Sequence, residues 1–199
     1  MPLDADGSGP YNAAVLAPRE PVSLPSNAVE FRGSHLLGMI LLLTLLVAPG
    51  LAPASEVYFS PNGGVRQRLA RAIEDSHKSI DIAVYNFTAS ELAEALYAAR
   101  ARGVSIRVLT DQERAQTGGS GIRGLRLNGV PVRTLGVPEQ SLMHHKFAVF
   151  DERIVVTGSY NWTNSAEHVN YENVIILDDP GVVNRFRQEF QRLWREARE

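Results

Sequence analysis

The stretch MHHKFAVFDERIVVTGSYNW, Met143 to Trp162, sets two adjacent histidines, a lysine and an aspartate among residues typical of buried strands. Residues 143–150 and 153–158 are rich in Val, Ile and Phe, and the turn residues DER separate them, so the pattern predicts two neighbouring strands. Side chains alternate between the faces of a strand, which places His144 and Lys146 on one face and His145 on the other. Only one of the two histidines can therefore join the lysine.

Outward from this stretch, strand-like and helix-like patterns alternate along the chain. Such alternation predicts the α/β class, with a mixed, largely parallel β-sheet flanked by helices. The predicted strands are 56–60, 79–87, 104–111, 130–135, 143–150, 153–158 and 173–177, and the predicted helices are 64–76, 88–103 and 181–199. The last helix is amphipathic, and its expected inward residues are Val183, Phe186, Phe190, Leu193 and Trp194.

The N-terminal quarter of the chain differs in composition from the rest. Residues 33–55 contain no Asp, Glu, Lys or Arg and include the apolar run LLGMILLLTLLV followed by APAS. We predict a polar tail over 1–34, a signal peptide over 35–54 and a catalytic domain over 55–199. The signal peptide implies an exported, periplasmic or secreted protein, and the alternative is that 35–54 remains as a membrane anchor.

The charge and the cysteine content of the chain limit the reactions and binding partners that are open to it. The chain has no cysteine, which excludes disulfides, thiolate catalysis and cysteine-ligated zinc. Residues 55–199 hold 18 basic and 18 acidic side chains, but seven arginines and only two acidic residues lie between Arg100 and Arg133. A Gly- and Ser-rich mobile loop is expected over 116–129, carrying Arg123 and Arg126 as nucleic-acid contacts; a solvated charged face is the alternative.

The end of the second strand supplies further polar groups beside the histidine and lysine. Ser159 and Asn161 offer short side-chain donors, and Gly158 allows a ligand to approach the backbone. Imidazole can attack phosphorus while a lysine and neutral donors stabilise charge on the phosphate oxygens. Asp151 begins the turn between the strands and is expected to brace it in support of the site. The pattern therefore favours cleavage of a phosphodiester.

The six spaced positions, H-x-K-x4-D followed by G-S-x-N, resemble the signature of the phospholipase D superfamily, and the strands 79–87 and 104–111 look like those of its small bacterial endonucleases. The resemblance implies that His144 is a nucleophile that forms a phosphohistidine. It also implies that Lys146 and Asn161 hold the phosphate with Ser159 beside them. Asp151 would be mainly structural, and Glu172 would orient the catalytic histidine.

The chain holds one copy of a motif that the mechanism of this family uses twice, which implies a homodimer with a shared active site. Neither a metal nor another cofactor is expected, because lysine and asparagine supply the charge stabilisation. The leading prediction is a metal-independent endonuclease acting on DNA or RNA. The alternatives are a phospholipase D or cardiolipin-type hydrolase acting on anionic phospholipid, and a noncatalytic nucleic-acid-binding scaffold.

Overall fold

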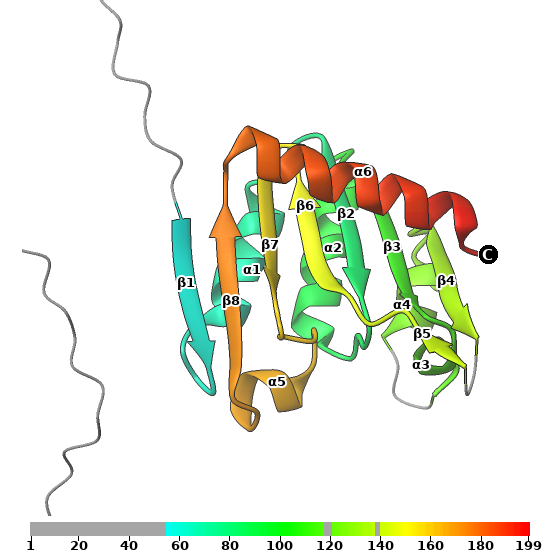
Figure 1. Ribbon diagram of the computed structural model, residues 1–199, viewed down its shortest axis with the longest axis horizontal. Coiled ribbons are helices and arrows are strands. Elements are labelled where there is room, and N and C mark those ends of the chain that lie inside the picture. The colour runs from blue at the N-terminus through cyan, green and yellow to red at the C-terminus, as the bar shows by residue number, and fades with distance from the viewer. Residues whose placement is uncertain (1–54, 118–120, 138–139) are drawn as a thin grey trace, which may run out of the picture. The chain divides into compact units, whose positions relative to one another are not determined.

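The computed structural model describes residues 55–117, 121–137 and 140–199, which form one mixed sheet with helices on both faces (Figure 1). The predicted segments 1–34 and 35–54 lie outside the described residues. The strands are β1 (Ser55–Ser60), β2 (Ser79–Val84), β3 (Ser105–Asp111), β4 (Val132–Val137), β5 (Ser141–Leu142), β6 (Lys146–Phe150), β7 (Ile154–Gly158) and β8 (Glu172–Leu177). The helices are α1 (Val65–Glu74), α2 (Ser90–Ala101), α3 (Gln112–Gln116), α4 (Ile122–Leu127), α5 (Asn164–His168) and α6 (Pro180–Glu196).

The sheet has the strand order β1-β8-β7-β6-β2-β3-β4-β5. Its mixed character and its flanking helices confirm the predicted class, but the expectation of a largely parallel sheet is wrong. Only β2–β3 and β3–β4 pair in parallel, whereas the other five neighbours are antiparallel. For β6 and β7 the reason is the short turn between them, since strands joined by so few residues can pair only as an antiparallel hairpin.

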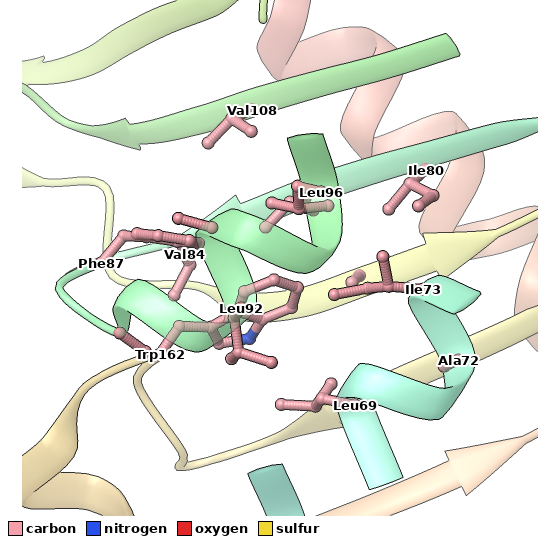
Figure 2. Packing of buried hydrophobic residues seen from close by; sticks show 14 of the residues in the cluster. Leu69, Ala72, Ile73, Ile80, Val84, Phe87, Leu92, Leu96, Val108 and Trp162 are labelled. Atoms are coloured by element: carbon pink, nitrogen blue, oxygen red, sulfur yellow. The ribbon is translucent and has the colours of Figure 1, made fainter. Parts of the chain in front are cut away.

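Two hydrophobic cores cover the two faces of the sheet. On one face α1 and α2 pack against β2, β3 and β6, and Figure 2 shows Leu69 and Leu92 of these helices beside Trp162. On the other face α6 runs across the strands (Figure 1) and buries Val183, Phe190 and Leu193. The predicted inward face of the terminal helix is therefore confirmed. Within the described ranges, no helix is long and apolar enough to cross a membrane.

The segment predicted as a mobile loop over 116–129 contains helix α4, so that prediction is wrong. Ile122 and Leu125 of α4 are buried, and the Gly121 N–H donates a 2.8 Å hydrogen bond to the Phe87 carbonyl oxygen. Two apolar residues three positions apart give a short helix a face to bury, which the Gly- and Ser-rich composition concealed. Arg123 and Arg126 lie on the exposed side of this helix.

Candidate active site

His144 and Lys146 lie together at the start of β6, a central strand of the sheet. Lys146 Nζ is 2.9 Å from His144 Nδ1 and 3.1 Å from Nε2, and it donates a 2.9 Å hydrogen bond to the His144 carbonyl oxygen. His145 makes different contacts: its ring packs 5.5 Å from that of Phe147, and its Nε2 is 3.8 Å from Glu189 Oε1 on α6. The predicted strand 143–150 begins only at Lys146 in the structure, so both histidines precede β6, but the predicted pairing of His144 with the lysine is observed.

The surroundings of His144 favour its neutral form. Burial lowers the pKa of His144, and the positive charges of Lys146 and His145 lower it further, while the negative charge of Asp111 raises it. Burial also lowers the pKa of Lys146, and Glu172 opposes that effect. A neutral imidazole has a free lone pair, so His144 is suited to act as a nucleophile at neutral pH.

Asn161 is held in place by a backbone contact from the end of β2. Its side-chain oxygen Oδ1 accepts a 3.2 Å hydrogen bond from the Asn86 N–H. Because the oxygen is engaged in this way, the amide N–H groups are the end available to a ligand in the pocket. This orientation suits a donor to phosphate, the role that the sequence predicted.

Gly158 has a packing role that differs from the predicted ligand approach. A Cβ atom at Gly158 would overlap the carbonyl oxygen of Asn173 on β8. The Ser159 N–H donates a 3.1 Å hydrogen bond to the same oxygen, and the Asn173 N–H donates one of 3.1 Å to Ser159 Oγ. Glycine therefore allows β7 and β8 to approach closely where the site residues leave the sheet.

Glu172 begins β8 and reaches the same pocket. Its carboxylate accepts a short hydrogen bond from the Ser159 hydroxyl and one of 3.1 Å from Asn170 Nδ2. Among the described residues no hydrogen bond joins Glu172 to His144, the contact predicted for it. In this chain Glu172 instead fixes Ser159 and favours the charged form of Lys146.

These residues surround one open pocket of about 590 Å³. It lies at the end of the sheet where strand β6 begins and strand β7 ends. Its walls combine a cation, an imidazole, a carboxylate and neutral donors, with an apolar patch from β6 and α6. The lining residues are His144, His145, Lys146, Phe147, Thr157, Gly158, Ser159, Asn161, Glu172 and Phe186. A phosphate group fits this set of donors and its single ammonium.

Asp151 lies at the far end of β6 and does not line the pocket. Its carboxylate accepts backbone hydrogen bonds from His77, Lys78 and Ser79, at 2.9, 2.7 and 2.9 Å. Burial raises the pKa of Asp151, but these three N–H groups together outweigh it and hold the pKa below its usual value. Asp151 therefore ties the turn after β6 to the start of β2, as predicted for a supporting residue, and it cannot contact a substrate in this pocket.

Arg123 and Arg126 are also outside the pocket lining. They project from α4, and Arg126 borders a separate hollow with Arg133 and Trp194. The structure therefore does not bring these arginines to the reacting groups. A long substrate is required if they are to contact it.

Two residues near His144 were not singled out from the sequence. The Tyr85 ring lies 4.6 Å from the His144 ring, and Lys146 Nζ lies 5.3 Å from the Tyr85 ring centroid. Asp111 is buried and accepts a 3.1 Å hydrogen bond from the Met143 N–H. Their positions in the sequence could have pointed to the site. Tyr85 and Asp111 stand at the ends of neighbouring parallel strands, and such ends meet at one edge of a sheet.

In the part of the chain that the structure describes, the side chains that usually bind metals do not form a metal site. No group of three or more His, Cys, Asp or Glu side chains there could hold an ion. The predicted metal independence stays a prediction, which an assay in chelator tests.

A family model described as Cardiolipin synthase, PLD-like domain matches residues 69–194, which is more than half of the chain and includes the whole motif. The chain belongs to the phospholipase D superfamily. Solved structures share its fold: the phospholipase D family member Nuc from Salmonella typhimurium is 32% identical with a TM-score of 0.67, and the match covers 74% of this chain and 97% of Nuc. NucT from Helicobacter pylori is 25% identical with a TM-score of 0.68, over 73% of this chain and 98% of NucT.

Curated relatives of this phospholipase D family member include the mitochondrial cardiolipin hydrolases of Xenopus tropicalis and Homo sapiens. They are 43% identical over 131 residues and 38% identical over 157 residues. The matches cover 65% and 76% of this chain but only 60% and 62% of the relatives. These names describe mitochondrial proteins and give no support to export into a periplasm or medium.

Proposed function

We propose that this protein is a phosphodiesterase whose reaction passes through a phosphohistidine at His144. The observation that carries the proposal is the 2.9 Å contact between the His144 imidazole and Lys146 Nζ in a pocket that Asn161 also lines. One nitrogen of His144 would attack phosphorus, while Lys146 and Asn161 stabilise the negative charge on the phosphate oxygens. Membership in the phospholipase D superfamily and the hydrolase names of the relatives support the same reaction class.

The reaction needs a second proton-transfer group. As the bond from phosphorus to the leaving oxygen breaks, that oxygen must take a proton, and water that later attacks the phosphohistidine must lose one. His145 also lines the pocket, but its ring packs 5.5 Å from that of Phe147 and its Nε2 is 3.8 Å from Glu189 Oε1, so its contacts differ from those of His144. We therefore propose a homodimer in which His144 of each subunit faces one shared phosphate.

Nucleic acid is the first proposed substrate. The excess of arginine between Arg100 and Arg133 supports it, because phosphate contacts supply most nonspecific affinity for nucleic acid. The likeness to Nuc and NucT over nearly their whole lengths supports a domain of the same compact layout. DNA and RNA both carry the phosphodiester that the pocket suits.

A cardiolipin-type phospholipid is the second proposed substrate, and two observations favour it. The curated relatives named mitochondrial cardiolipin hydrolase reach 43% identity. In addition, Tyr171 beside Glu172 is 92% exposed, and Leu142 just before His144 is 54% exposed. Exposed apolar side chains next to a pocket suit contact with a lipid surface.

One assay separates the substrates. The purified full chain is incubated in chelator with plasmid DNA, single-stranded DNA, RNA and vesicles containing cardiolipin, and the products are analysed. Cleavage of nucleic acid in chelator is the expected result, and release of phosphatidic acid would establish the lipid substrate instead. Binding without turnover of any of the four would support the noncatalytic scaffold and contradict the proposed function.

The contribution of Arg123 and Arg126 can be measured through salt dependence. Charge reversal at both positions is expected to weaken nucleic-acid binding and to flatten its dependence on salt, by about one unit of slope for each phosphate that the variant no longer binds. The matched control reverses Arg185 and Arg195, which are exposed on α6. Equal slopes in the two variants would remove α4 from the proposed nucleic-acid surface.

We also propose that residues 35–54 direct the protein to a membrane, as a cleaved signal or as a retained anchor. Their uncharged, apolar composition supports this role. Cell fractionation with N-terminal sequencing of the mature protein tests it. A soluble chain that retains these residues would contradict both forms of the proposal.

A further inference from the structure

We propose that Asp111 is a positioning residue for the phosphohistidine reaction. It holds the nucleophile His144 from two sides. The inference rests on the proposed function, because it assigns a role in that reaction. Asp111 ends β3, and only 2% of its surface is exposed, although it is an acidic residue. A buried carboxylate is costly unless hydrogen bonds satisfy its oxygens, and each oxygen of Asp111 reaches a different support of His144.

The first support is the backbone immediately before His144. Asp111 Oδ2 accepts a 3.1 Å hydrogen bond from the Met143 N–H, and the Met143 side chain is buried in the core under α6. The same oxygen also lies against the end of β4, since a Cβ atom at Gly136 would come within 2.9 Å of it. Fixing the Met143 N–H fixes the peptide from which His144 projects.

The second support passes through α3 and an aromatic ring. Asp111 Oδ1 accepts 3.1 Å hydrogen bonds from the Glu113 and Arg114 N–H groups and so caps α3. Arg114 Nε in turn donates a 2.9 Å hydrogen bond to the Tyr85 hydroxyl, and the Tyr85 ring lies 4.6 Å from the His144 ring. Asp111 thereby holds Arg114 in place. Arg114 in turn holds the Tyr85 ring, which lies beside the His144 imidazole.

The charges around His144 add a separate consequence. Lys146 and His145 act on His144 as positive groups, and Asp111 is the negative group that opposes them. Glu172 acts on Lys146, and Arg114 reaches His144 only through Tyr85. Because Asp111 raises the pKa of His144, neutralising it is expected to lower that pKa further.

Asp111→Asn tests the inference, with Asp179→Asn as the matched control. Asp179 is also an aspartate that caps a helix, since its Oδ1 accepts a 2.8 Å hydrogen bond from the Val182 N–H of α6, but it lies outside the pocket lining. Asp111→Asn is expected to lower kcat about tenfold or more, as misplaced reacting groups do, with little change in KM. It should also move the acid limb of the pH profile to lower pH, whereas Asp179→Asn should change neither.

A second readout does not depend on turnover. NMR titration of the histidine rings in the full chain, with the His144 signal assigned by its loss in His144→Ala, should give a lower pKa for His144 in Asp111→Asn. An unchanged pKa together with an unchanged kcat would overturn the inference. If the wild-type chain cleaves none of the substrates, the proposed function fails, yet the titration still decides whether Asp111 acts on His144.

Tyr85→Phe keeps the test decisive if Asp111→Asn does not fold. This change removes only the hydroxyl that accepts the Arg114 bond, so the melting temperature should stay close to that of the wild type. A severalfold loss of kcat is expected, because the ring beside His144 loses its hydrogen bond from Arg114 and keeps only the guanidinium over its face. A kcat equal to that of the wild type would overturn the support through α3.

Discussion

His144 and His145 are neighbours in the segment that leads into β6, yet their side chains have different surroundings. His144 meets Lys146 and Tyr85, whereas His145 meets Phe147 and the carboxylate of Glu189. The first environment lowers the pKa of the imidazole through burial and a neighbouring cation. Chemistry is therefore expected at one of the two histidines only.

Replacing each histidine in turn tests this division. His144→Ala is expected to remove turnover, by at least about a thousandfold as for the loss of a nucleophile, while substrate binding and the melting temperature change little. His145→Ala is the matched control and should keep most of the activity, since 48% of its side chain is exposed and its contact with Glu189 is long. Loss of activity in His145→Ala alone would contradict the assignment.

Glu172 is expected to act through Lys146. Glu172→Gln keeps an oxygen that can accept the Ser159 bond but removes the charge that raises the pKa of Lys146. The pKa of Lys146 should fall, so the basic limb of the pH profile should move to lower pH, with a drop in kcat of about tenfold. Glu189→Gln on α6 is the control, and an equal shift there would show that Glu172 has no specific effect.

The sequence predicted which residues belong to the active site better than it predicted their contacts. Strand alternation was enough to pair His144 with Lys146. The partner of Glu172 could not be predicted, because it depends on the register that sets the start of β8 beside the end of β7. Asp111 was missed for a similar reason, since its bond to Met143 joins segments that are far apart in the chain.

Among the elements, β6 connects the pocket to the rest of the fold. Lys146 at one end faces the site, and Asp151 just beyond the other end holds the segment that begins β2. A strand that is anchored at both ends and paired on both sides has little freedom to move. The fixed spacing between lysine and aspartate in the motif is thus the length of one strand.

Asp151→Asn is expected to destabilise the fold by about 1–3 kcal/mol, because backbone N–H groups lose a charged acceptor. The folded-state pKa of Asp151 is below its usual value, so its stabilising effect is complete above about pH 4 and is lost as pH falls through the folded pKa. The difference in free energy of unfolding between wild type and variant should therefore shrink below about pH 4. Denaturant unfolding at several pH values measures it.

Asp178→Asn provides the comparison for this change, because Asp178 is exposed. It should alter stability by less than about 0.5 kcal/mol, as surface substitutions usually do. If Asp151→Asn matched this control at neutral pH, the three backbone contacts would not contribute to stability.

Most strands and the long helices could be predicted from their apolar patterns, as the terminal helix α6 shows. Pairing direction could not, because it depends on connections rather than on patterns: the three residues between β6 and β7 decide it for the motif. Short helices such as α3 and α4 were also missed. Their turns hold too few apolar residues to show a period, and capping by Asp111 is a local contact that composition does not reveal.

For the whole molecule, the proposed shared site makes activity depend on pairs of chains. Wild-type chains refolded with a large excess of His144→Ala should lose activity beyond dilution, because most wild-type chains would then lie in dimers with one histidine. Specific activity per wild-type chain and the proportion of mixed dimers are the quantities to measure. Constant specific activity while mixed dimers form would show that each chain works alone.

The strand order also fixes when the domain can be completed during synthesis. β2 needs β6 as its antiparallel neighbour, and β1 needs β8, so the first two strands leave the ribosome long before their partners exist. Until then residues 80–84 present an apolar, unpaired edge, the kind of surface that favours aggregation in nascent chains. Translation of residues 146–150 closes that edge and adds Lys146, whereas Asn161 and Glu172 are made later, so β2 is paired before the pocket is complete.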